Sequence, residues 1–427
     1  MEGLIVLLVM VVMMFLSVPV AFAMISTSIL IYVFIAHIPL GVVVQNMFSS
    51  IQSYSYSAVP YFILAGNIMA RGSLAKKLLD IAEAHVGFIP SGLPIAAVVG
   101  CALFGSITGS DIATLAAIGG IMFPALVSRG YSKAFVGAIL GPSALLGMLI
   151  PPTIPGLIYA LVAEVSVMKV FLSGVLPAII IMSFFSIYIF IKGKKLFPDQ
   201  KFQKPDLLKM VRSLRNGGAA LGMPVIIFGG IYGGIFTVTE AAAVAAAYTL
   251  IVELFIHRGL TFRQIPMVAV ETGILTSVVL LLVSGASVLS RYLSLEQIPQ
   301  LWAEQIFGMV QDKWIFLLFV NFFLLVTGCL MDILSATVIL VPILKQLCIK
   351  FSIDEIFFAN MFLLNLYIGF LTPPVGVNIF VVSGMFNIPF AQVCKSFVPY
   401  FFMLMATLIL VNLFPWLSIW LPNLLSR

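Results

Sequence analysis

Two stretches of this sequence end in a double proline: LGMLIPP at residues 146–152 and IGFLTPP at residues 368–374. The two stretches are 222 positions apart, and Pro177 matches Pro399 at the same offset. Gly, Leu and Pro are common in this chain, so coincidence is the alternative explanation, but three prolines that share one offset favour an internal repeat. Repeats whose helices are interrupted at matching positions are typical of membrane transporters.

The composition of the chain places it in a membrane. Of its 427 residues, 62% are hydrophobic and only 9% are charged, whereas an ordinary soluble domain is about one quarter charged. A soluble enzyme or a nucleic-acid-binding protein could not cover its surface with so few polar groups, so the net charge of +6 does not indicate nucleic acid. Since a transmembrane helix needs about 20 apolar residues, the length predicts an all-α polytopic membrane protein with about 11–12 transmembrane helices.

A basic segment divides the chain into two apolar halves. Eight of the 22 Lys and Arg residues fall between positions 192 and 215. Basic loops stay on the cytoplasmic side of a membrane, so we expect the connector at residues 192–216 to be cytoplasmic. It would join a first membrane half at residues 1–191 to a second at residues 217–427. We predict that the halves are inverted repeats, which requires an odd number of spans in each half.

Four segments inside or beside apolar stretches contain residues that interrupt helices: GSITGSD at 105–111, IPPTIPG at 150–156, GCLMD at 328–332 and LTPPVGVN at 371–378. A double proline removes two backbone donors and forces the residue before it out of the helical region. In lipid an unpaired backbone group costs several kcal/mol, so a helix breaks only where protein or a water-lined cavity satisfies that group. We therefore predict broken helices around a polar site.

The broken segments offer two kinds of ligand. Carbonyl oxygens freed at a break, together with Ser, Thr and Asn oxygens, suit a sodium ion, and the free N–H groups where a helix restarts suit a carboxylate. Polar helix–helix contacts and simple proline kinks are the alternatives, since Ser and Thr also bond to their own backbone. The predicted sodium ligands are Ser106, Gly109, Ser110, Asp111, Gly147, Pro151, Asp332, Thr372, Pro374 and Gly376. The predicted substrate-binding residues are Ser106, Thr108, Thr153, Thr372 and Asn378.

Asp111 and Asp332 are the conspicuous acidic residues within the apolar stretches. A carboxylate in the bilayer is costly and indicates a functional site. Each aspartate could bind a cation, carry a proton, or pair with Arg71 or Arg291, and a position at the membrane surface is the alternative. Two rival functions follow from these residues. An intramembrane aspartyl protease would need Asp111 and Asp332 to share a proton at close range, and a channel would need a continuous pore.

Motifs of nucleotide, thiol and zinc chemistry are missing from the sequence. It contains no GxxxxGK[ST] loop, no HExxH and no CxxC, which are the signatures of nucleotide binding, zinc hydrolases and thiol–disulfide or metal sites. We therefore expect neither a nucleotide cofactor nor an enzyme.

Several of these motifs together resemble the large membrane subunit of the tripartite ATP-independent periplasmic (TRAP) transporters. The resemblance covers nearly the whole chain and is carried by residues 105–124, the Ile-Pro-Pro segment at 150–152, GIFTVTEAAA at 234–243 and TPPVG at 372–376. It implies a scaffold domain and a moving transport domain with two re-entrant hairpins, which together work as an elevator.

The same resemblance implies partners and an energy source. The subunit would lie in the bacterial inner membrane with a small four-helix membrane subunit, and a periplasmic substrate-binding protein would deliver the substrate. Because the chain shows no additional four-span segment at its start, we expect the small subunit to be a separate polypeptide. Sodium would drive uptake, and the substrate would be an organic acid such as sialic acid or a C4-dicarboxylate.

Overall fold

The computed structural model describes residues 9–425 apart from positions 11, 14–15, 17, 201, 299–300, 302–303, 306–307, 309, 311 and 374–375. Within this part of the chain all regular structure is helical. Nine of its helices are long and apolar enough to cross a membrane, and six shorter apolar helices have 10–17 residues. The prediction of an all-α polytopic membrane protein is confirmed, and the breaks explain why several expected spans occur as shorter pieces.

The first half of the chain contains α2 (Val20–Leu30), α3 (Leu40–Ile51), α4 (Ala58–Arg71), α5 (Leu74–Val86), α6 (Gly92–Thr108), α7 (Asp111–Thr114), α8 (Gly120–Ser128), α9 (Lys133–Ala144), α10 (Leu146–Leu149), α11 (Ile154–Ala163), α12 (Val167–Ser173) and α13 (Val175–Leu196). The second half contains α14 (Leu207–Tyr232), α15 (Val238–Ile251), α16 (Ile265–Leu295), α18 (Lys313–Leu330), α19 (Ile333–Lys350), α20 (Glu355–Gly369), α21 (Val377–Phe386), α22 (Phe390–Leu413) and α23 (Trp416–Leu425). A π-helical turn joins α7 to α8, and another, η4 (Val252–Ile256), extends α15.

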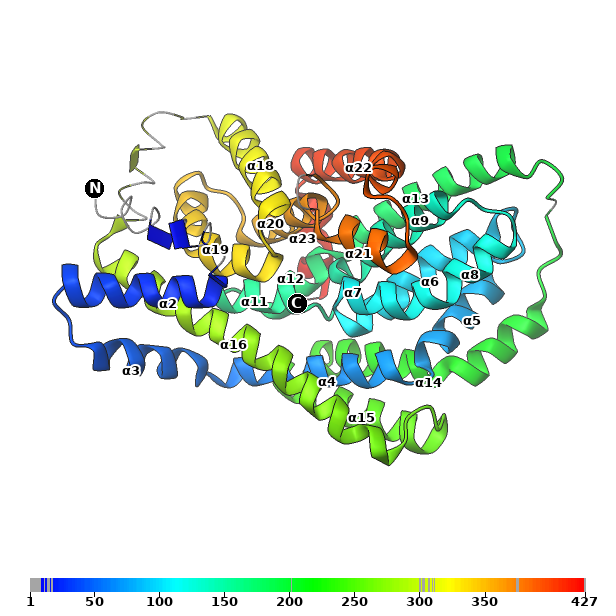
Figure 1. The fold of residues 1–427 in the computed structure, drawn as a ribbon, viewed down its shortest axis with the longest axis horizontal. Coiled ribbons are helices and arrows are strands. Elements are labelled where there is room, and N and C mark those ends of the chain that lie inside the picture. Colours follow the sequence, from blue (N-terminus) through cyan, green and yellow to red (C-terminus); the bar gives the residue numbers. More distant parts are fainter. Residues whose placement is uncertain are drawn as a thin grey trace.

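One group of helices packs around α16, which has 31 residues. It contacts α2, α3 and α4, while α15 lies between α4 and α14, and Figure 1 shows these helices together along the lower side of the molecule. Ala241, Ala242 and Ala245 of α15 are completely buried, since side chains this small let neighbouring helices approach closely. We call α2, α3, α4, α14, α15 and α16 the outer group.

The broken helices form a second group, which we call the inner group: α6 to α13 and α18 to α23. Here α6 packs on α9, α10 and α13, and α20 packs on α18 and α22. From Ile356 to Gly369 every residue of α20 is buried. Helices of the two sequence halves interlock, because α11 lies against α19 and α21 lies against α9. Burial of polar backbone on all sides is what allows irregular structure within a membrane.

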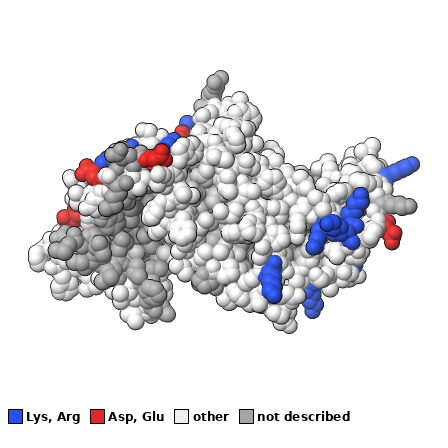
Figure 2. Space-filling view, turned by 90° about the horizontal axis from the view of Figure 1, so that it is seen from above, with Lys and Arg blue, Asp and Glu red and all other residues white. Residues whose placement is uncertain are grey.

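The connector between the halves begins and ends within helices. Helix α13 continues to Leu196 and α14 starts at Leu207, so the described residues between them are not helical. Lys201 lies outside the described residues. Figure 2 shows one face of the molecule that is largely uncharged, with a group of Lys and Arg side chains at its right end. The cytoplasmic position of this basic end remains a prediction from the charge pattern.

Candidate functional site

All four predicted breaks are confirmed: helices are interrupted at residues 109–110, 150–153 and 331–332, and in the fourth segment α20 ends at Gly369 while α21 begins only at Val377. The first double proline lies within the candidate span Lys133–Ala163, in which 83% of the most apolar window is buried within the protein. This is the highest buried share among the nine spans found in the described residues. The broken backbone is therefore held inside protein, as the cost of unpaired amides in lipid requires.

Three of the four helices that restart after a break are capped by a predicted site residue. The hydroxyl of Ser110 accepts a hydrogen bond from the Ala113 N–H at 3.3 Å, and the hydroxyl of Thr153 accepts one from Gly156 at 3.2 Å. The Asp332 carboxylate accepts the N–H of Ser335 at 3.0 Å. Such side-chain caps stabilise the first turn of a helix. They also leave lone pairs on these oxygens that can contact a ligand.

A pair of glycines crosses beside the first break, and an equivalent pair crosses beside the third and fourth. A Cβ atom on Gly147 would lie 2.2 Å from the Cα of Gly105, and one on Gly369 would lie 2.3 Å from the carbonyl carbon of Gly328. Gly147 and Gly369 share the 222-residue offset of the double prolines. Both halves of the sequence repeat therefore contain a close contact between two glycines. Gly147, which was predicted as a sodium ligand, lies where the backbones of two helices touch.

The remaining predicted hydroxyls bond within their own segments. Ser106 donates to the Leu103 carbonyl oxygen and Thr372 to the Ile368 carbonyl oxygen, each at 2.8 Å. Thr108 shares a hydrogen bond with Thr114 at 3.2 Å. These contacts match the alternative that such hydroxyls satisfy local backbone, and a ligand role for them stays a prediction.

The other predicted sodium ligands are glycines and prolines, which could offer only backbone carbonyl oxygens. Gly109 and Gly376 adopt positive φ angles of 61° and 50°, which glycine reaches without steric cost. Pro151 is buried within the second break, and Pro374 lies outside the described residues.

The two aspartates occupy different environments. Asp111 is only 5% exposed, and one of its carboxylate oxygens is buried with no hydrogen-bond partner in the described structure. Asp332 is exposed and caps α19. Arg71, a suggested partner of both, instead binds Glu271 in α16. Asp111 is therefore the buried acid of this site.

Three of the buried oxygens that have no hydrogen-bond partner in the described structure lie on inner-group helices that contact one another. They belong to Asp111 in α7, Ser143 in α9 and Asn378 in α21, and these three helices pack against one another. The Asn378 amide also donates to the Gly141 carbonyl oxygen at 3.2 Å. Uncompensated buried oxygens are costly, and a hard cation that prefers oxygen ligands would remove that cost. Ser143 could not be predicted from the sequence, because a serine in an apolar helix carries no motif.

Tyr367 joins the two broken elements directly. Its hydroxyl donates to the Met148 carbonyl oxygen at 2.7 Å, in the turn just before the first double proline, although 219 positions separate the two residues. The backbone N–H of Asn378 likewise bridges the fourth break by donating to the Phe370 carbonyl oxygen at 3.2 Å. The role of Tyr367 could not be predicted from the sequence, since only the tertiary structure brings it to the Met148 carbonyl oxygen.

Residues 7–417 match the family described as the tripartite ATP-independent periplasmic transporter, DctM component. The chain belongs to this family. It is 38% identical to the C4-dicarboxylate TRAP transporter large permease protein DctM of Pseudomonas aeruginosa, with 89% of each chain covered. It is 33% identical to the ectoine/5-hydroxyectoine TRAP transporter large permease protein UehC of Ruegeria pomeroyi, again with 89% of each covered.

A third relative is longer than this DctM chain. The isethionate TRAP transporter permease protein DctMQ of Oleidesulfovibrio alaskensis is 36% identical over 93% of this chain, which spans 63% of that relative. Among solved structures, the Alcanivorax borkumensis YdaH transporter shares the fold, with a TM-score of 0.61 at 12% identity over 87% of both chains. The resemblance expected from the motifs is confirmed, and the chain is a multi-pass protein of the bacterial inner membrane. The named relatives are permease subunits and not enzymes, which disfavours the protease alternative.

We expect Tyr367→Phe to destabilise the DctM chain by about 1–2 kcal/mol, because the buried Met148 carbonyl oxygen would lose its donor. Thermal unfolding of the purified protein measures this change. The matched control is Tyr400→Phe, since the Tyr400 hydroxyl is buried without a partner and its removal should cost little. Equal loss of stability in both variants would contradict the role assigned to the Tyr367 bond.

Proposed function

We propose that this DctM chain carries the translocation pathway of a sodium-coupled, ATP-independent uptake system for a small organic acid. The observation that carries the proposal is the set of unpartnered buried oxygens of Asp111, Ser143 and Asn378 at the meeting of broken helices. One carboxylate and two neutral oxygens suit a monovalent hard cation. In the described residues no group of three or more His, Cys, Asp or Glu side chains could hold a metal ion, so the oxygen set resembles an alkali-ion site more than a transition-metal site.

The substrate class follows from the restarted helices and from the relatives. Helices α11 and α21 begin at the second and fourth breaks, and a helix N-terminus favours an anionic group. Relatives are named for C4-dicarboxylates, isethionate and ectoine, which are all small molecules with an acidic group. We propose a substrate of the C4-dicarboxylate or sialic acid class, contacted by Thr153, Thr372 and Asn378.

Sodium coupling supplies enough energy without a nucleotide. If two sodium ions accompany one monocarboxylate, one net positive charge enters, and the membrane potential contributes roughly 2.3 kcal/mol per 100 mV. This corresponds to about a 50-fold concentration gradient, before the sodium gradient itself is counted.

The two helix groups suggest how the site is exposed to each side of the membrane. The inner group holds the breaks, and in the outer group α2, α3 and α4 pack on the long helix α16. We propose that the inner group moves past the outer group as an elevator. We further propose that a small four-helix subunit and a periplasmic binding protein complete the system.

Reconstituted uptake tests the proposal. Vesicles would contain this chain, the small subunit and the binding protein, and carboxylates of both classes would be offered with and without a sodium gradient. We expect saturable, sodium-dependent accumulation that requires all three proteins. Uptake that proceeds equally in potassium would exclude sodium coupling, and uptake that does not saturate would favour the channel alternative.

A further inference from the structure

The chain bends between α4 and α5, at Gly72 and Ser73. Helix α4 belongs to the outer group, whereas α5 packs on α6 of the inner group and on α14. This corner is therefore where the first covalent connection between the two groups begins.

A completely buried carboxylate holds the corner. Glu253 lies in η4, at the end of α15, and is 0% exposed. One of its oxygens accepts the backbone N–H of Leu74 at 2.9 Å, and the other accepts the hydroxyl of Ser73 at 3.3 Å. A carboxylate that accepts N–H groups at a helix N-terminus stabilises that terminus through hydrogen bonds and through the helix dipole. Glu253 thus caps α5 from a helix of the outer group.

Two glycines leave room for the Glu253 carboxylate. A Cβ atom on Gly72 would lie 2.1 Å from one of its oxygens, and a Cβ atom on Gly259 would lie 2.3 Å from the other. Any other residue at either position would displace the carboxylate. The backbone on both sides is therefore shaped to this one side chain.

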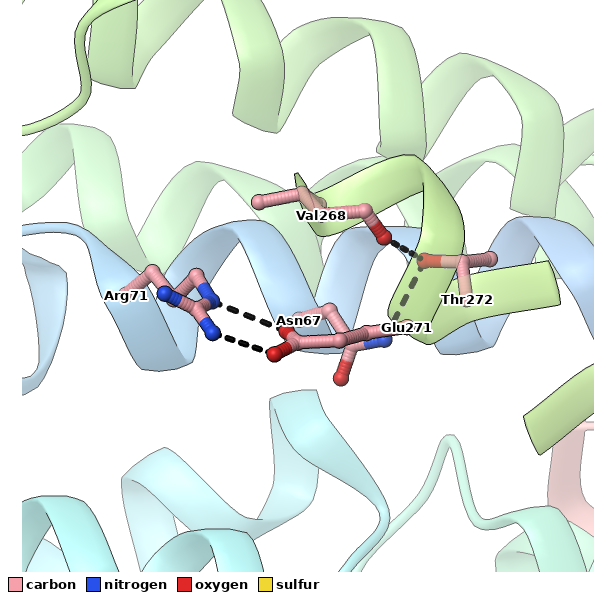
Figure 3. Close-up of polar contacts among 5 residues, drawn as sticks. All are labelled: Asn67, Arg71, Val268, Glu271 and Thr272. Atoms are coloured by element: carbon pink, nitrogen blue, oxygen red, sulfur yellow. Dashed lines mark hydrogen bonds and ion pairs between the residues drawn. The ribbon is translucent and has the colours of Figure 1, made fainter. Parts of the chain in front are cut away.

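A second set of contacts fastens the end of α4 beside the corner. Figure 3 shows the Arg71 guanidinium facing the Glu271 carboxylate of α16. The Nε–H of Arg71 donates to a Glu271 carboxylate oxygen at 2.8 Å. One turn earlier, the Asn67 amide donates to the Thr272 hydroxyl at 3.1 Å. Contacts with α16 therefore fix the end of α4 before the corner, and contacts with η4 fix the start of α5 after it.

The loop after the opposite end of α5 is held by the connector. The N–H of Ser91 donates to the Gln200 side-chain oxygen at 3.0 Å, and the N–H of Gln203 donates to the Phe88 carbonyl oxygen at 2.9 Å. Helix α5 therefore spans from a corner fixed on the outer group to a corner fixed near α6 and α13.

We propose that Glu253 is a positioning residue that fixes the N-terminus of α5 to the outer group. The inner group would then move while this end of α5 stays in place. The consequence for transport rests on the proposed function above. The carboxylate acts through the α5 N-terminus and does not touch the candidate ion site. Its loss should therefore slow turnover without changing the affinity for substrate.

Hydrogen exchange and uptake of the full chain in lipid test this proposal. In Glu253→Ala we expect amide exchange at residues 74–78 to accelerate about tenfold, the size of a lost helix cap. We expect the kcat of reconstituted uptake to fall about tenfold, with KM unchanged. Glu253→Gln keeps an acceptor for the Leu74 N–H and a group that can bond the Ser73 hydroxyl, so both measurements should stay within about threefold of the wild type.

The matched control is Glu240→Ala at the other end of α15. The Glu240 carboxylate also caps a helix, through the N–H of Thr237 at 2.8 Å, but it is exposed and remote in sequence from the corner. We expect exchange at residues 74–78 and uptake to match the wild type in this variant.

Each other outcome is decisive. Unchanged exchange at residues 74–78 in Glu253→Ala, or a change in KM alone, would overturn the proposal. If amide exchange in the buried helix α20 also rose, general unfolding would explain the result for Glu253→Ala. The Glu253→Gln variant would then decide. Wild-type exchange and uptake in that variant would support the positioning role of Glu253, and a tenfold loss of uptake would overturn it. Absence of uptake by the wild-type protein would contradict the proposed transport function. Amide exchange at residues 74–78 would still test whether Glu253 fixes the N-terminus of α5.

Discussion

Replacing Gly147 by alanine should abolish uptake and leave little folded protein. The added Cβ atom would lie 2.2 Å from the Cα and 2.5 Å from the carbonyl carbon of Gly105. Both are backbone atoms, which cannot rotate away as a side chain can, so the α6–α10 crossing must separate. Overpacking a core usually costs about 1–3 kcal/mol, and we expect about 3 kcal/mol or more here because the breaks on both sides would shift with the crossing.

The repeat supplies a second test of the same kind, and open glycines supply the control. Gly369→Ala should be equally harmful, because its Cβ atom would lie 2.3 Å from the carbonyl carbon of Gly328. Gly120→Ala and Gly384→Ala are matched controls in broken elements, since a Cβ atom on either meets nothing within 4 Å. Thermal unfolding and reconstituted uptake measure the outcome. Wild-type stability in Gly147→Ala would show that the crossing is not close-packed.

Asp111→Asn should remove the sodium dependence of uptake. Its carboxylate is the acidic member of the three unpartnered buried oxygens, and asparagine keeps an oxygen at nearly the same place but loses the charge. Attraction between a cation and a carboxylate is strong where water is excluded. We expect sodium affinity to fall about 100-fold, which corresponds to about 2.7 kcal/mol. Asp332→Asn is the matched control, because Asp332 is exposed at the equivalent position of the second half.

Sodium titration of thermal stability measures this effect separately from transport. A ligand that binds only the folded protein raises its melting temperature, so sodium should stabilise the wild type and Asp332→Asn but not Asp111→Asn. Ser143→Ala should show an intermediate loss, since it removes a neutral oxygen. Equal stabilisation of all four proteins by sodium would exclude an ion site at Asp111.

The breaks could be read from the sequence because their causes are local. Consecutive prolines at 151–152 and 373–374 remove two backbone donors and clash with the preceding turn, so they interrupt a helix. Gly109 ends one helix, and Ser110 and Asp332 cap the helices that follow. Composition likewise requires no knowledge of contacts between distant residues, and it was sufficient to predict an all-helical membrane protein. The span count was less accessible, since a broken span and two short helices look alike along the chain.

The sequence by itself therefore determined where the helices stop, and that each half repeats the same interruptions. Only the tertiary structure decided which of two similar aspartates is buried and that the Tyr367 hydroxyl reaches the Met148 carbonyl oxygen. It also decided that Glu253 caps a helix 179 positions away. These facts depend on contacts between helices that are far apart in the chain. No local pattern encodes such contacts, because they arise only when apolar faces pack and leave particular oxygens between them.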